Sequence, residues 1–137
     1  MTDWNDWNQA VIDEFRTNDG RVGGMFEGSP LLLLHHVGAR TGLRRVAPLM
    51  YQDVPDGYAI FASKGGADTN PDWYHNLVAN PETEAEVGSE TVPVLARIAN
   101  DEERTRIWTR QKSDYPQFAD YESKTQRVIP VVVLERT

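Results

Sequence analysis

Apolar residues recur at helical spacing near the N-terminus. The spacing of three and four positions predicts an amphipathic helix over residues 3–17, within an N-terminal segment of residues 1–18. The sequence NDG at residues 18–20 is a typical helix stop. We interpret this helix as one packed on the core, with a mobile arm closing over a site as the alternative. The apolar positions are Trp4, Trp7, Val11 and Phe15.

Strand-like segments follow, and the first two flank a tight turn. Gly38 and Gly42 lie in that turn, where their conformational freedom favours a β-hairpin. Pro48 falls inside the second strand and predicts a sheet edge or a bulge, because proline cannot donate to a strand ladder. Short turns between the three strands predict an antiparallel meander. These strands are Leu31–Val37, Arg45–Tyr51 and Tyr58–Ser63.

The second half of the chain mixes helices and strands. Asn70 is expected to cap the helix that follows it, with Pro71 as the first helical residue. The resulting order of elements predicts an α+β fold with a closed or partly closed antiparallel barrel of about six strands and inserted helices. The segments are helix 72–79, strands 84–87 and 90–98, a helix from about 101 to 112, a short helix ending by 124, and strand 128–134.

Length, composition and charge exclude several classes of protein. A length of 137 residues predicts one domain over residues 1–137. The chain has no cysteine, which excludes disulfides, thiolate catalysis and cysteine-held metal clusters. A formal net charge of −7 argues against nucleic-acid binding. Apolar runs such as Leu31 to Leu34 are far too short to span a membrane, and the acidic start lacks a signal sequence, so we expect a cytoplasmic protein.

Two turns have the character of anion sites. Arg40, Arg44 and Arg45 cluster at the hairpin turn, and no acidic residue occurs between positions 31 and 52, although the protein as a whole is acidic. The second turn carries Ser63, Lys64 and the pair Gly65-Gly66 ahead of a helix N-terminus, where free backbone N–H groups can bind an anion. Taken alone, this second pattern is also typical of an ordinary strand-to-helix connection.

Other catalytic patterns are missing. His35 and His36 are adjacent and point to opposite faces of a strand, so they do not form a metal site. No GxSxG motif and no identifiable carboxylate pair is present. Basic turns together with aromatic residues suit a large planar cofactor that has a phosphate tail and supplies the chemistry itself. These aromatic residues are Trp73, Tyr74, Tyr115, Phe118 and Tyr121.

Three motifs carry a resemblance to a known family. They are GARTGLRRVAPL at residues 38–49, SKGGADTNPDWYHNLVANP at residues 63–81, and the segment from Tyr115-Pro116 through Tyr121 to RVIPV at residues 127–131. With these motifs the chain resembles the deazaflavin-dependent nitroreductase family, small split β-barrel proteins that use coenzyme F-420. The similarity extends over nearly everything after Leu31.

The resemblance implies a reaction. Family members pass a hydride from reduced F-420 to an electron-poor acceptor such as an activated alkene, a quinone or a nitro compound. It implies that Arg40, Arg44, Arg45 and Lys64 bind the anionic phosphate–oligoglutamate tail. It further implies that Tyr121 and Tyr115 line the substrate side as candidate catalytic residues. The other implied cofactor-binding residues are Thr41, Pro48, Met50, Ser63, Gly65, Gly66, Trp73 and Asn76.

Alternatives stay open at this point. An FMN-dependent reductase on the same barrel is one, although FMN has no glutamate tail for three arginines to bind. A non-catalytic carrier of F-420 or another ligand is the second. The chain also departs from the family pattern at Ala39, where a basic residue is common, and at Met50, where an aromatic residue is common. A homodimer is expected from the resemblance.

Overall fold

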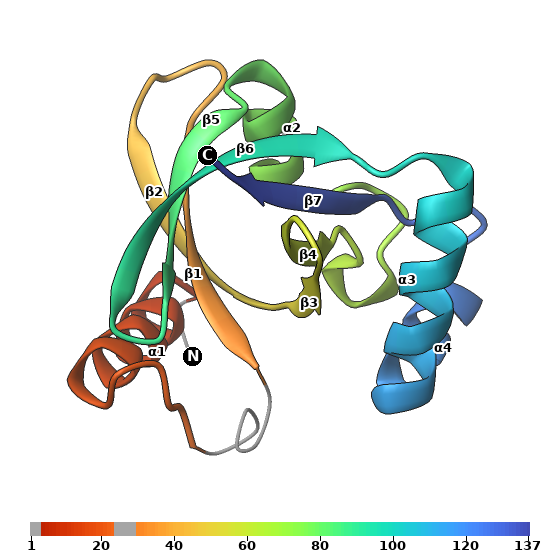
Figure 1. Ribbon diagram of the computed structural model, residues 1–137, viewed down its shortest axis with the longest axis horizontal. Coiled ribbons are helices and arrows are strands. Elements are labelled where there is room, and N and C mark those ends of the chain that lie inside the picture. The colour runs from red at the N-terminus through yellow and green to blue at the C-terminus, as the bar shows by residue number, and fades with distance from the viewer. Residues whose placement is uncertain (1–3, 24–29) are drawn as a thin grey trace.

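A strongly curled antiparallel sheet forms the body of the protein (Figure 1). The computed structural model describes residues 4–23 and 30–137. The seven strands are β1 Leu31–Val37, β2 Arg44–Met50, β3 Gln52–Val54, β4 Gly57–Phe61, β5 Glu82–Val87, β6 Glu90–Ile98 and β7 Val131–Arg136. Their order in the sheet is β2-β1-β5-β6-β7-β4-β3. The predicted α+β fold with an antiparallel split barrel is confirmed, with seven strands where about six were expected.

The predicted three-strand meander is wrong. β1 and β2 pair along their whole length, but β4 pairs with β3 and β7 instead of β2. The short strand β3 lies in residues that read as the start of a turn, and it continues the chain from β2 to the far edge of the sheet. β2 itself is an edge strand, as Pro48 predicted, with Pro48 opposite Leu33.

Helices occupy the two ends of the sheet. α1 (Trp4–Thr17) packs beside β1 and β2, whereas α3 (Asp101–Asp114) and α4 (Gln117–Ser123) cover the opposite end (Figure 1). α2 (Asp72–Ala79) follows a single 3-10 turn, η2 (Lys64–Gly66), and contacts β1 and β6. No helix in the described parts of the chain is long and apolar enough to cross a membrane.

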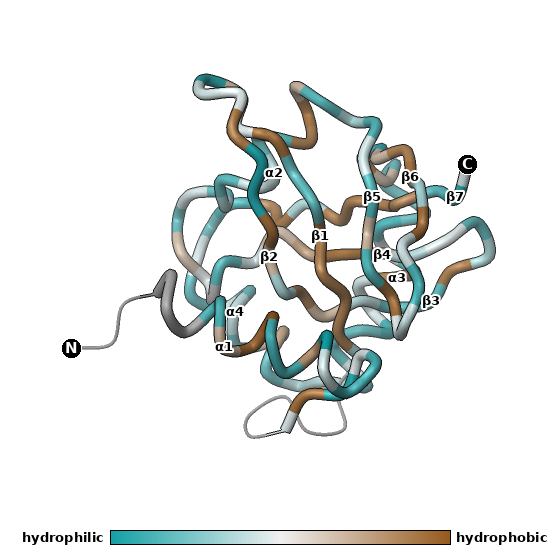
Figure 2. Tube along the Cα trace, turned by 90° about the vertical axis from the view of Figure 1, so that its left-hand side faces the viewer, coloured by the Kyte–Doolittle hydropathy of each residue, from teal (hydrophilic) through white to brown (hydrophobic). Residues whose placement is uncertain are grey.

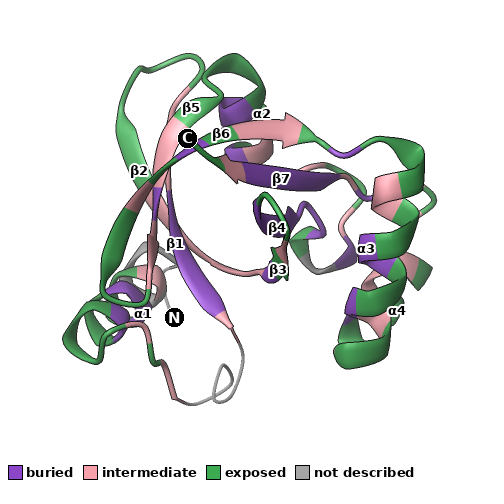
Figure 3. Cartoon of the chain, viewed as in Figure 1, coloured by how far each residue is buried: buried purple, intermediate pink, exposed green. Residues whose placement is uncertain are grey.

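The apolar strands β7 and β4 are buried on both faces. In β7 and β4, alternate residues enter opposite core clusters, so that Val132 and Ile60 lie in one cluster while Val131 and Ala59 lie in the other. A strand with two buried faces needs a continuous apolar run instead of an alternating one. The tube in Figure 2 and the burial colours in Figure 3 show these apolar, buried strands between more polar, exposed edges.

β1 is buried in the same way by α1. Leu32 and Leu34 face the central cluster, while Leu31 and Leu33 pack against Val11, Ile12 and Phe15 of the helix. The core-packing interpretation of this helix is therefore confirmed for Val11 and Phe15. The side chains of Trp4 and Trp7 lie outside the described residues. The helix ends as expected, with Asp19 and Gly20 at positive φ.

Two local expectations need correction. The cap of α2 is Pro71, in an extended conformation, and the helix begins at Asp72. Asn70 does not cap the helix, because its side-chain oxygen accepts a hydrogen bond from Arg127 instead. The last strand begins at Val131, three residues later than expected, since the preceding segment runs along the core and reaches β4 through a hydrogen bond from Ala62 N–H to the Pro130 carbonyl.

Candidate functional site: two clefts along β2 and α2

The hairpin turn and α2 enclose a basic cleft of about 580 Å³. We call it the arginine cleft. Four of the predicted cofactor-binding residues, Arg40, Thr41, Arg45 and Asn76, line it. The remaining lining residues are Gly38, Ala39, Asp72 and His75. The cleft thus joins residues 38–45 of the first motif with residues 72–76 of the second, and two exposed guanidinium groups give it the charge to bind an anion.

Asn76 fixes the position of the hairpin turn relative to α2. Its side-chain oxygen accepts a hydrogen bond from the Ala39 N–H at 2.9 Å. Its amide nitrogen lies 2.9 Å from Nδ1 of His36 on β1. One buried side chain therefore ties together the turn, the strand and the helix that build the arginine cleft.

The two adjacent histidines have separate environments, as their alternation on a strand predicted. Burial and the nearby Arg45 guanidinium lower the pKa of His36 to about 4, so its imidazole is neutral at pH 7. His35 points the other way, with Nε2 2.8 Å from Glu86. Glu86 also accepts two hydrogen bonds from Arg16, and these lower the pKa of its carboxyl group. No group of three or more potential metal ligands occurs among the described residues.

A second cleft, of about 260 Å³, lies farther along the same two elements. We call it the aromatic cleft. It contains six of the predicted site residues: Pro48, Met50, Ser63, Lys64, Trp73 and Tyr121. Leu49, Phe61, Pro71 and Phe118 complete its lining. Residues of β2 and of the start of α2 line both clefts. This arrangement suits a single extended ligand with one part in the arginine cleft and another part in the aromatic cleft.

The loop between β4 and α2 passes very close to α4. Gly66 has a φ of +89°, and a Cβ atom there would lie 2.8 Å from the Tyr121 carbonyl oxygen. Glycine at this position therefore lets α4 bring Tyr121 and Phe118 against the aromatic cleft. Lys64 also has a positive φ, +48°, and its Nζ donates to the Thr69 hydroxyl at 3.2 Å.

Sequence reasoning missed Arg127, which holds this loop from the other side. Its guanidinium donates hydrogen bonds of 2.7 to 3.0 Å to four oxygens, all in residues 62–70. The acceptors are the carbonyls of Ala62, Ser63 and Ala67 and the side chain of Asn70. The arginine appeared in the third motif, but no spacing rule connects position 127 with the loop that it binds.

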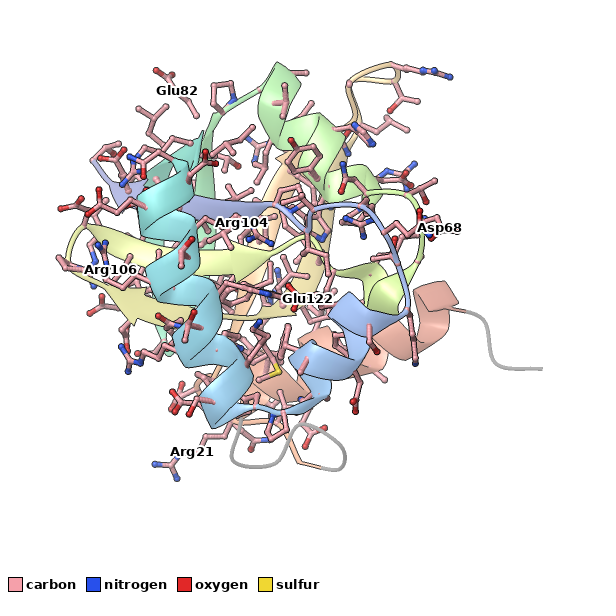
Figure 4. All side chains as sticks on the ribbon, turned by 90° about the vertical axis from the view of Figure 1, so that its right-hand side faces the viewer. Arg21, Asp68, Glu82, Arg104, Arg106 and Glu122 are labelled. Carbon is pink, nitrogen blue, oxygen red and sulfur yellow. The ribbon has the colours of Figure 1, made fainter. Side chains whose placement is uncertain are left out.

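α4 itself is held against α3 by a carboxylate. Glu122 accepts hydrogen bonds from Trp108 Nε1 and from Lys112 Nζ on α3. Figure 4 shows Glu122 in the space between the two helices. Burial tends to raise the pKa of Glu122, but these two donors outweigh it and the pKa is lowered. The wall of the aromatic cleft that carries Tyr121 is thus anchored by charge as well as by packing.

Three of the predicted residues, Arg44, Gly66 and Tyr115, are not among those that line either cleft. Arg44 is exposed at the start of β2, opposite Val37. Gly66 ends η2, to which Gly65 also belongs, and Tyr115 packs against a core cluster. The sequence analysis also overlooked lining residues such as Asp72 and Phe61, because an acid in a first helical turn and an apolar residue in a strand have ordinary structural explanations.

Comparison with known proteins identifies the family of this chain. Residues 7–136 match the family model described as F-420H(2)-dependent quinone reductase. The chain belongs to this family. It is 41% identical to an F-420H(2)-dependent quinone reductase of Mycobacterium tuberculosis over 126 residues, which are 89% of this chain and 85% of the relative. The expected family and the expected class, an F-420-dependent reductase, are confirmed.

Solved structures agree with this assignment. An F-420-H2 dependent reductase named FDR-A matches with a TM-score of 0.70 and 39% identity, covering 77% of this chain and 94% of that one. A protein described as a domain-swapped dimer matches with a TM-score of 0.72 and 36% identity over 96% and 97% of the two chains. The haem storage protein of Vibrio cholerae, with a TM-score of 0.60 and 16% identity over 95% and 90%, shows the shared fold alone.

Family membership decides between the cofactor alternatives. Coenzyme F-420 is the cofactor of this family, as the resemblance implied, and the FMN and carrier alternatives are not favoured. The residues present fit such a group. The arginine cleft supplies donors for an anionic tail, and the aromatic cleft supplies flat apolar walls for a ring.

Proposed function

We propose that this protein is a quinone reductase in which F-420 binds across both clefts, with its deazaflavin ring in the aromatic cleft and its tail in the arginine cleft. The observation that carries the proposal is the construction of both clefts on β2 and the start of α2. The quinone as acceptor is supported by the name of the family and of the Mycobacterium tuberculosis relative.

Different residues of this chain bind the tail and the ring of the cofactor. When bound, reduced F-420 supplies the hydride. Arg40 and Arg45 hold the phosphate and carboxylate groups of the tail through charge-assisted hydrogen bonds. Ser63 and Lys64 lie along one wall of the aromatic cleft, and Trp73 forms part of its floor.

Reduction of a quinone to a quinol requires one proton in addition to the hydride. Tyr121 is the side chain we propose for the substrate side, because its half-buried ring lines the aromatic cleft and its phenol oxygen can donate a hydrogen bond to a quinone carbonyl. Tyr115 does not line either cleft and has no such role in the proposal. Phe118, packed at 5.3 Å from the Tyr121 ring, keeps that ring in place and excludes water.

The proposal is tested by comparing F-420 with its tail-less deazaflavin in fluorescence titrations. We expect the wild-type protein to bind F-420 at least tenfold more tightly than the tail-less compound, since only F-420 reaches the arginine cleft. The double variant Arg40→Ala/Arg45→Ala should reduce F-420 affinity to nearly that of the tail-less compound and leave the latter unchanged.

A matched control removes the same charge elsewhere. Arg106 and Arg110 are exposed on α3, away from both clefts, and their double alanine variant should retain wild-type affinity for F-420. If both double variants weaken F-420 equally, general electrostatics and not the arginine cleft binds the tail. If wild-type protein binds neither compound, the proposed function is wrong.

Assembly and location belong to the same proposal. A homodimer is supported by the relative described as a domain-swapped dimer, which matches nearly the whole chain. The cytoplasmic location and the single domain over residues 1–137 stay predictions from the sequence. Sedimentation of the purified protein at micromolar concentration tests the dimer.

A further inference from the structure

We propose that His36 is a positioning residue for cofactor binding, because its Nδ1 atom holds the side-chain amide of Asn76 in one orientation at the arginine cleft. The inference rests on the proposed function, in which that cleft holds the tail of F-420. His36 does not itself line the cleft and acts only through Asn76. No part of the sequence pattern pointed to this role.

The hydrogen bonds of Asn76 allow a single orientation of its amide. A backbone N–H from Ala39 approaches one end of the amide, so that end must be the oxygen. The other end, 2.9 Å from His36 Nδ1, is then the NH2 group, and it donates. His36 Nδ1 must accept this hydrogen bond, which places the imidazole proton on Nε2.

The surroundings of His36 keep Nδ1 free to accept. His36 is 6% exposed on β1, and the nearby charged and titratable groups are Arg45, Asp72 and His35, of which His35 points to the opposite face of the strand. Burial and Arg45 both disfavour the imidazolium, whereas Asp72 favours it, and the balance leaves the ring neutral. A protonated Nδ1 would confront the Asn76 NH2 with a second donor.

Loss of the acceptor at position 36 leaves the buried Asn76 NH2 group without the partner that holds it. The amide could then turn away from the Ala39 N–H and release the turn in which the adjacent Arg40 lies. A displaced turn weakens binding of the tail and leaves the aromatic cleft, where the ring binds, unaltered.

Two substitutions separate this role from simple packing. His36→Leu keeps an apolar side chain of similar bulk but removes the acceptor. His36→Asn can place its side-chain oxygen close to where Nδ1 lies. We expect His36→Leu to raise the Kd for F-420 and its KM about tenfold with kcat within twofold of wild type, and His36→Asn to stay within twofold in both.

Two further measurements complete the test: the affinity for the tail-less deazaflavin and the tautomer of the His36 ring. Affinity for the tail-less compound should be the same in wild type and both variants. In the free wild-type protein, the nitrogen chemical shifts of His36 should report a neutral ring with the proton on Nε2, which requires no variant and no cofactor. Failure of wild type to bind F-420 would overturn the proposed function while this tautomer measurement still stands.

Three results would overturn the inference. The first is a neutral His36 with its proton on Nδ1. The second is equal loss of F-420 affinity in the leucine and asparagine variants. The third is a loss of affinity for the tail-less compound as large as that for F-420, which would indicate a general structural role.

Discussion

Replacing Arg127 with alanine removes a side chain that ties both ends of the β4–α2 loop together. The guanidinium reaches the Ala62 and Ser63 carbonyls at the end of β4 and also Ala67 and Asn70 farther along the loop. All four acceptors are neutral oxygens. Ser63 and Lys64 line the aromatic cleft, and Lys64 lies between the contacts to Ser63 and Ala67.

The structure sets the size of the effect. A hydrogen bond from a charged donor contributes about 1.5–3 kcal/mol when it is well buried, and less where water can replace the donor. Because Arg127 is half-buried, we take about 1.5 kcal/mol for each of the four bonds and expect water, by hydrating the freed carbonyls, to restore about half of the total. Arg127→Ala should then lower the free energy of unfolding by about 3 kcal/mol, which corresponds to a fall in Tm of roughly 10 °C.

Urea unfolding and F-420 titration measure the two consequences separately. Arg127→Lys keeps the charge but cannot span four acceptors, so it should lose about 2 kcal/mol. Binding of F-420, measured well below the unfolding midpoint, should weaken at least tenfold in Arg127→Ala. Arg110→Ala is the control, since its exposed ion pair with Asp114 is worth under about 1 kcal/mol. An Arg127→Ala protein as stable as this control would refute the reasoning.

Two further predictions concern a glycine and the buried histidine. Gly66→Ala places a Cβ 2.8 Å from the Tyr121 carbonyl oxygen at a positive φ, so it should lower the free energy of unfolding by about 2–3 kcal/mol in thermal unfolding. The control Gly42→Ala is also at positive φ, but among the described residues beyond its chain neighbours no heavy atom lies within 4 Å of the added Cβ, so it should cost only about 1 kcal/mol. Equal losses in the two variants would contradict the close approach of α4. His36 has a folded-state pKa of about 4 against an ordinary value of 6.5, so the unfolded chain takes up the proton first and stability is lost as the pH falls from about 6.5 to about 4. In wild type, His36 should account for a loss of about 3 kcal/mol in the free energy of unfolding over this pH range. The variant His36→Asn should lack this part of the pH dependence, and parallel pH–stability curves for the two proteins would contradict the prediction.

Local patterns in the sequence identified the elements that build the site. The hairpin, the loop after Ser63 and α2 were all visible because glycine, proline and helix signals act over a few residues. The apolar runs at Leu31 and Val131 indicated strands, and the structure shows that both are continuous because each strand is buried on two faces.

Long-range pairing could not be predicted in the same way. The meander was wrong because the partner of β4 is β7, seventy residues away in the chain, and hydrophobic alternation does not specify which strands pair. Arg127 was missed for a similar reason, since its acceptors are mostly backbone carbonyls, which no residue type reveals. The link from His36 to Asn76 likewise depends on β1 and α2 meeting in space.

The most direct test of the central claim follows reduced F-420 spectroscopically in the presence of a soluble quinone and catalytic amounts of the protein. The proposed function predicts that absorbance of oxidised F-420 returns at a rate proportional to protein concentration, and that Arg40→Ala/Arg45→Ala slows this at low cofactor concentration. A rate no faster than that without protein, at cofactor concentrations where binding is complete, would contradict it.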